Sequence, residues 1–365
     1  MLTDAGQQAF FVGGCVRNDL LGQPVSDIDI ATDARPDRVM ELAESAGLKA
    51  VPTGIEHGTV TVVSGGMPHE ITTFRKDIET DGRHAVVTFS DRPEEDARRR
   101  DFTMNALYAD RTGQVLDPVG GLADLTARRV RFIGNAADRI REDFLRTLRF
   151  FRFHAWYGDP QAGLDSDALA AISGHLDGLD RLSKERVGAE IKKLLSAPDP
   201  APSVAAMRQA GVLGRVLPGT DDRFLAPLIH LENGIGADAI RRLAALGGSD
   251  VADRLRLSRK EARRLSLLRD LVGAGPALDE IGYRHGAEIG RDVALLRAAF
   301  AGREVSKEEF ESVEFGARQA FPVSAADLPG SYQGPALGQA LKQLEQRWVS
   351  SGFSLGKDDL VAGLK

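Results

Sequence analysis

The sequence predicts an α+β protein in which an N-terminal sheet-and-helix domain is followed by all-helical domains. Before about residue 125, short apolar runs rich in β-branched residues alternate with turn residues, which indicates strands. Beyond that point, segments rich in Ala, Leu, Arg and Glu repeat their apolar residues at helical spacing. A length of 365 residues suits two or three globular units. We therefore predict domains over 1–125, 126–200 and 201–365.

Composition and charge narrow the class of function. The chain is 42% apolar and 27% charged, as globular proteins are, and 47 Lys and Arg against 53 Asp and Glu give a net charge of −6. This balance argues against a protein that binds polyanions through bulk charge, so a nucleic-acid contact must use local basic patches. No apolar run has the length of a membrane helix, and Cys15 is the single cysteine. We expect a cytoplasmic protein with no membrane contact.

The individual elements follow from local patterns. Strands are expected at 9–12 (AFFV), 27–31 (DIDIA), 58–63 (GTVTVV) and 69–74 (HEITTF). PDRVMELAESAG predicts a helix with Pro36 in its first turn and Gly47 at its C-cap. REDFLRTLRFFRFHAW predicts one continuous helix over 141–156, and RLSKERVGAEIKK predicts another that braces it through Arg186, Glu190 and Lys193.

Two aspartates in the second strand are candidate metal ligands. The period of two in DIDIA puts Asp27 and Asp29 on one face and the two isoleucines on the other, in a core. Two adjacent carboxylates repel each other unless a cation lies between them, and hard oxygen ligands favour Mg²⁺. Glu70 in HEITTF is the best-placed third acid. The alternatives are two incidental solvent-facing aspartates and, for Glu70, an edge-strand charge.

A pair of glycines upstream suggests that the metal would act on a bound phosphate group. Gly13 and Gly14 directly follow a predicted strand, which allows the backbone to approach a phosphate closely, and Arg17 adds a positive fork nearby. A metal held by Asp27 and Asp29 beside a triphosphate could activate a hydroxyl nucleophile and neutralise charge on leaving pyrophosphate. Cys15 is read as a small packing residue, since no histidine is near it in the sequence.

Six motifs together resemble a known enzyme family. GGCVRNDLLG, DIDIAT, EITTFR, RRRDFTMNAL, DPVGGLADL and EDFLRTLRFFRF occur between residues 11 and 153 in the order typical of the nucleotidyltransferases that add CCA to tRNA 3′ ends and of the similar bacterial poly(A) polymerases. The resemblance implies phosphate binding by Gly14 and Arg17, metal binding by Asp27 and Asp29, and a nucleotide contact from Arg100. The family usually has Asp after the motif arginine, where this chain has the uncharged Asn18.

The segment around residue 145 offers a way to select bases without a template. Cytosine and adenine both present an amine donor beside a ring-nitrogen acceptor, whereas guanine and uracil present a carbonyl beside an N–H. One acceptor and one donor therefore sort the bases, and the resemblance assigns these roles to Asp143 and Arg146 of the EDxxR motif. It also implies nucleotide contacts from Arg149 and Arg152. The alternative is a salt-bridged helix face. Asp117 in DPVGGLADL is read as a turn former.

The resemblance implies a catalytic head domain, a base-recognition neck, and a tRNA-binding body and tail, with Mg²⁺ as cofactor and CTP, ATP and tRNA as substrates and partner. No obligate protein partner is inferred. Basic residues between Arg254 and Arg269 are candidates for holding the tRNA backbone. The alternatives are a bacterial poly(A) polymerase, an enzyme that adds only CC or only A, and a non-catalytic RNA-binding relative.

Overall fold

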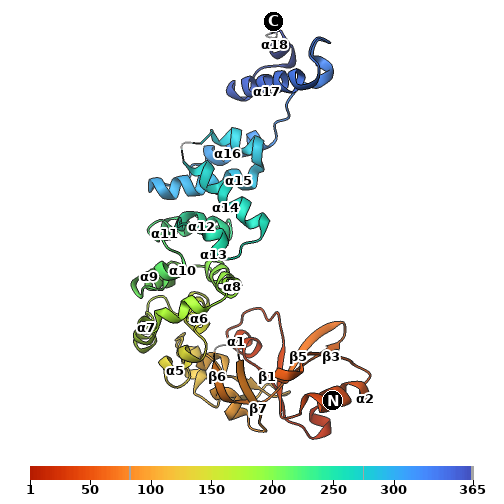
Figure 1. The fold of residues 1–365 in the computed structure, drawn as a ribbon, viewed down its shortest axis with the longest axis vertical. Coiled ribbons are helices and arrows are strands. Elements are labelled where there is room, and N and C mark those ends of the chain that lie inside the picture. The colour runs from red at the N-terminus through yellow and green to blue at the C-terminus, as the bar shows by residue number, and fades with distance from the viewer. Residues whose placement is uncertain (82–83, 274, 363–365) are drawn as a thin grey trace. The chain divides into compact units, whose positions relative to one another are not determined.

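The computed structural model describes residues 1–81, 84–273 and 275–362, without the side chains of 77–87. The chain, drawn as a ribbon in Figure 1, divides into two compact units. The first comprises Met1–Thr220 and Gly248–Arg256, and the second comprises Asp221–Gly247 and Leu257–Lys365. Both boundaries expected from the sequence, at 125 and 200, fall inside the first unit, so the three-domain division stays a prediction.

A seven-stranded mixed sheet forms the N-terminal part of the first unit. Its strand order is β3-β4-β5-β2-β1-β8-β9, and of its neighbouring pairs only β2 and β5 run parallel. The strands are β1 Ala9–Val12, β2 Asp29–Thr32, β3 Lys49–Gly54, β4 Thr59–Ser64, β5 Met67–Thr73, β8 Tyr108–Ala109 and β9 Val115–Leu116, and a separate hairpin pairs β6 Arg75–Asp81 with β7 His84–Phe89. The α+β prediction and the four expected strand regions are confirmed.

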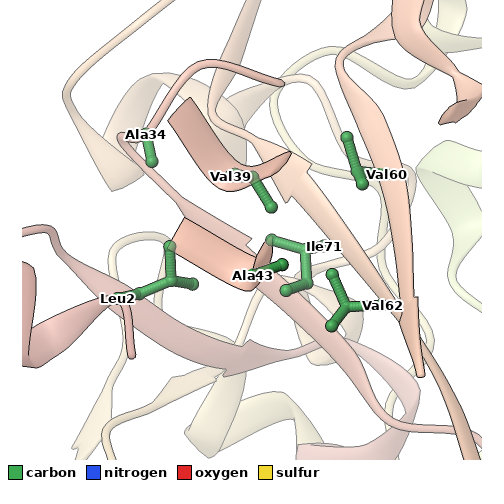
Figure 2. Packing of buried hydrophobic residues seen from close by; sticks show 7 residues of the cluster. All are labelled: Leu2, Ala34, Val39, Ala43, Val60, Val62 and Ile71. Atoms are coloured by element: carbon green, nitrogen blue, oxygen red, sulfur yellow. The ribbon is translucent and has the colours of Figure 1, made fainter. Parts of the chain in front are cut away.

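Each face of this sheet packs against a hydrophobic core. On one face lies α2, Pro36–Ser45, whose buried residues meet those of β4 and β5. Figure 2 shows this cluster: Leu2, Ala34, Val39, Ala43, Val60, Val62 and Ile71. The second core contains Val12, Ala31, Phe74, Ala97, Ala106, Tyr108 and Ile133. Because successive strand residues point to opposite faces, Ile30 packs on the first core and Asp29 lies on the face of the second.

Helices make up most of the rest of the first unit, as predicted. They are α1 Gly14–Leu20, α3 Pro93–Arg98, α4 Gly121–Thr126, α5 Ala136–Glu142, α6 Leu145–Tyr157, α7 Ser166–Ser173, α8 Lys184–Leu195, α9 Ala201–Gln209, α10 Val212–Val216 and α13 Val251–Arg254. Ion pairs from α8 brace this region, as expected: Glu190 pairs with Arg152 of α6, and Arg186 pairs with Asp143, two residues before α6. Lys193 contributes its carbonyl, which accepts from Trp156.

The single helix expected over 141–156 is wrong in one respect. α5 ends at Glu142 and α6 begins at Leu145, and Asp143 between them is extended, with φ −151° and ψ 106°. The Asp143 carboxylate accepts a hydrogen bond from the backbone N–H of Leu145, at 3.1 Å. A short acidic side chain that satisfies a helix-start N–H competes with helix continuation, which accounts for the break.

The described residues of the second unit form helices joined by loops, with no named strand among them. Its helices are α11 Leu225–Leu231, α12 Ala239–Leu246, α14 Arg259–Val272, α15 Leu278–Ala301, α16 Lys307–Ala317, α17 Gly334–Ser350 and α18 Lys357–Val361. Trp348 and Leu344 of α17 centre an apolar cluster that includes Leu360 of α18. In both units, none of the described helices combines the length and apolarity needed to span a bilayer.

Candidate active site

The turn after β1 is a tight glycine turn, as predicted. β1 ends at Val12, and Gly13 turns the chain into α1 with φ 76° and ψ −121°, a conformation that favours glycine. A Cβ on Gly13 would lie 3.3 Å from Nη1 of Arg100. The turn therefore presents bare backbone directly beside a guanidinium.

The acids expected to bind metal lie near this turn, with Asp29 at the start of β2 and Glu70 within β5. Asp29 and Glu70 are register partners across the parallel pair, so their side chains share a face. Although Asp29 is exposed, desolvation by its surroundings, then the charge of Glu70, raise its pKa, and Arg100 opposes the rise. Asp27 adds a smaller repulsion. Glu70, Asp27 and Arg100 thus all lie within electrostatic reach of Asp29.

Asp27 differs from the prediction in one detail, because it precedes β2 rather than belonging to it. β1 pairs with β2 from Ala9↔Thr32 to Phe11↔Ile30 and then ends at the Gly13 turn. Among the described strands, none pairs with residues 27 and 28. Asp27 is exposed and its carboxylate accepts a hydrogen bond from Ser26 at 3.1 Å.

The donor set suits a hard divalent cation. Within the described part of the chain, the Asp29 and Glu70 carboxylates have no hydrogen-bond or ion-pair partner, and their mutual repulsion favours a cation between them. Among the described residues, no group of three or more His, Cys, Asp or Glu is already arranged to hold a metal ion. A pair of carboxylates completed by water and substrate oxygens is the arrangement that Mg²⁺ commonly accepts.

Arg17 lies beneath the glycine turn and is largely engaged by protein groups. Its guanidinium donates to the side-chain oxygens of Asn18 and Asn105, and to the Tyr157 hydroxyl at 2.8 Å. The guanidinium carbon lies 3.9 Å from the centre of the Tyr157 ring, a cation–π geometry. Desolvation lowers the pKa of Arg17. Asn18, the departure from the family pattern, therefore serves as a neutral acceptor for Arg17.

The two residues expected to read the base have separate protein partners. Asp143 accepts from Arg186 at 2.6 Å, and Arg146 donates to Glu142 at 2.5 Å and to the carbonyls of Arg99 and Arg139. Both side chains retain partial exposure. The structure therefore places Asp143 and Arg146 three residues apart at the start of α6, each held by its own counter-charge.

The remaining two arginines of the α6 stripe are braced by acids. Arg149 donates to Asp101 through Nε, at 2.7 Å, and Arg152 donates to Glu190 at 2.6 Å. Asp101 is buried, and it also accepts from the N–H of Phe102. These contacts bear out the salt-bridged face weighed for this segment, so any nucleotide contact from Arg149 or Arg152 must share the guanidinium with its acid.

Some features differ from expectation or were missed. Arg264 and Arg269 of the expected basic face instead serve the interior of the second unit, where Arg264 pairs with Asp238 at 2.8 Å. Arg259, Lys260 and Arg263 stay exposed. Asp117 caps a turn by accepting from two backbone N–H groups, as predicted. Sequence reasoning overlooked Asp96, which contacts Arg100; the signal was an acid placed three and four residues before two arginines.

The fold and this constellation define a nucleotidyltransferase: residues 9–131 match the family model "Poly A polymerase head domain", and residues 163–224 match "Probable RNA and SrmB- binding site of polymerase A". The chain is 33% identical to the mouse mitochondrial CCA tRNA nucleotidyltransferase 1, over 97% of this chain and 85% of that protein. The chain therefore belongs to the CCA tRNA nucleotidyltransferase family.

Bacterial relatives agree with this assignment. The CCA-adding enzyme of Geobacillus thermodenitrificans is 42% identical over 60% of this chain, which corresponds to 52% of that enzyme. The crystal structure of the Bacillus stearothermophilus CCA-adding enzyme in complex with CTP superposes with a TM-score of 0.74 at 29% identity, covering 96% of this chain and 91% of that one. Nucleotidyltransferases of this family generally use a divalent metal ion.

Proposed function

We propose that this enzyme adds CCA to the 3′ end of tRNA from CTP and ATP without a template, releasing pyrophosphate. The observation that carries the proposal is the juxtaposition of an acidic strand pair, Asp29 beside Glu70, with the Gly13 turn and the Arg100 guanidinium. Acids that gather metal and a cationic glycine turn that accepts phosphate are the two halves of a nucleotidyl-transfer site.

The chain's own residues then position the reactants. The bare backbone at Gly13 and Gly14 admits the triphosphate, Arg100 donates to it, and Arg17 adds positive charge beneath the turn. Asp27 and Asp29 would hold Mg²⁺, with Glu70 as a third acid beside them. When bound, Mg²⁺ makes the RNA hydroxyl a better nucleophile and neutralises charge on the departing pyrophosphate. The tRNA 3′ oxygen bonds to the α-phosphorus as the bond to pyrophosphate breaks.

Base choice is proposed to rest on Asp143 and Arg146. A carboxylate that accepts from the exocyclic amine and a guanidinium that donates to the ring nitrogen fit both cytosine and adenine. Guanine or uracil would leave these groups unsatisfied, at a cost of about 1–3 kcal/mol each. In this structure Asp143 is bound by Arg186 and Arg146 by Glu142, so a bound base would share each group with its partner or displace that partner. Arg149 and Arg152 are proposed as further nucleotide contacts.

Exposed basic residues of α14 are proposed to hold the tRNA backbone. Arg259, Lys260 and Arg263 all face solvent in the first turns of this helix. Contacts to phosphate release counterions, so affinity for tRNA should fall steeply as salt rises.

An extension assay tests the proposal and separates its alternatives. Three tRNAs, ending before the first C, after CC and after CCA, are each offered the four nucleotides separately. We expect C on the first, A on the second and nothing on the third. A partial-specificity enzyme would extend only one of the first two tRNAs. A CC-adding enzyme would add C to the shortest tRNA and leave the CC-ended one unextended, and an A-adding enzyme would do the reverse. Repeated ATP incorporation on unstructured RNA would identify a poly(A) polymerase, and no incorporation would identify a non-catalytic relative.

A further inference from the structure

The Arg100 guanidinium is held by one edge and open along the other. Its Nε and Nη2 both donate to one carboxylate oxygen of Asp96, at 3.2 and 3.0 Å. In the described residues Nη1 has no hydrogen-bond partner, and it is the atom that a Cβ on Gly13 would approach within 3.3 Å. The open edge therefore faces the glycine turn.

Asp96 is a buried carboxylate with an unusual number of donors. The residue is 2% exposed, and the oxygen that accepts from Arg100 also accepts from the Tyr108 hydroxyl at 2.8 Å. The second oxygen accepts from Nε of Arg99 at 3.2 Å. These cations and the tyrosine keep the pKa of Asp96 low despite its burial. A buried charge is retained only where it is well paired, so the position of Asp96 is fixed by its partners.

Two N–H groups held by one oxygen define the plane and the direction of a guanidinium. Tyr108 adds a second anchor, because its hydroxyl also accepts from Nε of Arg100 at 3.2 Å, and the Tyr108 ring is fully buried in the second sheet core. An arginine fixed in this way donates to a ligand without first losing conformational freedom.

We propose that Asp96, with Tyr108, is a positioning residue that aims Nη1 of Arg100 at the phosphates of the incoming nucleotide. This inference rests on the proposed function, and it names the nucleotide triphosphate, not the base, as the group that Asp96 serves. The triphosphate is common to CTP and ATP. Loss of Asp96 must therefore weaken both nucleotides by the same factor and leave the choice between bases unchanged.

The experiment uses the full-length enzyme with Asp96→Asn and Tyr108→Phe. Loss of one hydrogen bond to a charged group typically weakens binding by about tenfold or more, so we expect KM for CTP and for ATP to rise together by about tenfold for Asp96→Asn, and by less for Tyr108→Phe. The matched control is Tyr283→Phe, which removes a tyrosine hydroxyl bound to Glu345 in the second unit. It should leave both KM values unchanged.

A double-mutant cycle tests whether Asp96 acts through Arg100. If it does, Asp96→Asn added to Arg100→Lys raises KM by little more than Arg100→Lys alone. Binding of inorganic triphosphate, measured by calorimetry, supplies a readout without a base or tRNA. It should weaken in Asp96→Asn and Tyr108→Phe but not in Tyr283→Phe. This readout stays informative if the wild-type enzyme adds no CCA, which would overturn the proposed function alone.

Three results would overturn the positioning role. One is lower thermal stability in both variants with unchanged KM and triphosphate affinity, which marks a role in folding only. The second is a changed ratio of CTP to ATP use, which places Asp96 in base reading. The third is full additivity in the cycle. Should Asp96→Asn fail to fold, Tyr108→Phe decides, since it keeps the buried ring and removes only the hydroxyl.

Discussion

Two groups of acidic residues in this protein have opposite surroundings. Asp29 at the start of β2 and Glu70 within β5 are exposed, in register, and without a hydrogen-bonded partner among the described residues. In the second unit, Glu232 and Asp292 are buried, and each carboxylate is shared by two arginines: Glu232 by Arg241 and Arg242, and Asp292 by Arg241 and Arg264.

The difference shows which of the two groups of acids can gain free energy by binding a ligand. Buried charges must be paired, and the Glu232 and Asp292 carboxylates are each already bound by two arginines, so they serve the fold. Carboxylates that repel each other in the absence of a partner gain most when a cation arrives. Both groups consist of Asp and Glu, so their surroundings determine whether they can bind a ligand or stabilise the fold.

The largest expected effect is on the exposed acids without a protein partner, Asp29 and Glu70, which we call the open acids. Asp29→Asn removes a proposed metal ligand, and metal-assisted stabilisation of the transition state is worth several kcal/mol, so turnover should fall by about a thousandfold or more. Binding of tRNA, measured by filter retention, should persist. Asp37→Asn, which changes an exposed acid in the first turn of α2, is the matched control and should keep full turnover. Undiminished turnover in Asp29→Asn would refute the metal assignment.

The next prediction concerns the buried acids that are paired with arginines, Glu232 and Asp292, which we call the closed acids. Glu232→Gln keeps the shape of the side chain but leaves Arg241 and Arg242, both buried, without their shared carboxylate. Breaking a buried ion pair costs about 3–5 kcal/mol, which urea denaturation should show as lower free energy of unfolding.

An exposed pair provides the contrast for Glu232→Gln. Glu41→Gln removes an acid that pairs with Arg38 on the surface of α2, where such a pair contributes about 0–1 kcal/mol. Equal losses in the two variants would contradict the distinction between open and closed charges.

Arg17 lies between these two extremes, because it is buried but held by neutral partners. Tyr157→Phe removes one hydroxyl acceptor of Arg17 and keeps the ring against the guanidinium, so we expect a loss of about 1 kcal/mol in unfolding free energy. Urea denaturation followed by the fluorescence of the adjacent Trp156 measures the loss. A cost above about 3 kcal/mol would show that Arg17 depends on the hydroxyl as a buried ion depends on its counter-ion.

Much of the head could be predicted from the sequence because local patterns decide it. The strands at 9–12 and 69–74, the helix from Pro36 and the turn at Gly13 all follow from alternation, capping and glycine chemistry. The predicted helix through Asp143 was wrong, since a side chain that caps the next helix outweighed the helical spacing. Asp27 was predicted to lie in the second strand but precedes β2, because the pairing of β1 with β2 ends at Phe11↔Ile30.

The sequence alone could not predict which side chains pair with one another in the folded protein. Arg264 and Arg269 count toward a basic segment, yet the tertiary fold turns both toward interior acceptors. Asp96 and Arg100 are spaced for a helical ion pair, but the burial of that pair and the direction of Nη1 depend on Tyr108 and Gly13, which are distant in sequence. Sequence spacing gives candidates for contacts, and packing decides which donors stay open.

The smallest expected effect concerns a buried group that avoids charge altogether. His154 of α6 is buried and shares a hydrogen bond with Ser203 of α9 at 2.8 Å, and desolvation lowers its pKa below the ordinary value of about 6.5. Between its folded pKa and 6.5, the unfolded chain binds a proton that the folded protein does not. Stability is therefore full above pH 6.5 and falls as pH decreases through that window, by at most about 1.4 kcal/mol per pH unit.

His154→Gln keeps hydrogen-bonding capacity toward Ser203 but cannot titrate in this range. Free energies of unfolding from urea denaturation at pH 7.5, 6.5 and 5.5 should therefore fall less steeply in the variant than in the wild type. The two curves should converge toward acidic pH, because the wild type alone loses the contribution of a neutral buried histidine. Parallel dependence of the two free energies of unfolding on pH would contradict this prediction. It would mean that His154 binds a proton in the folded protein and is charged there, as the paired groups are.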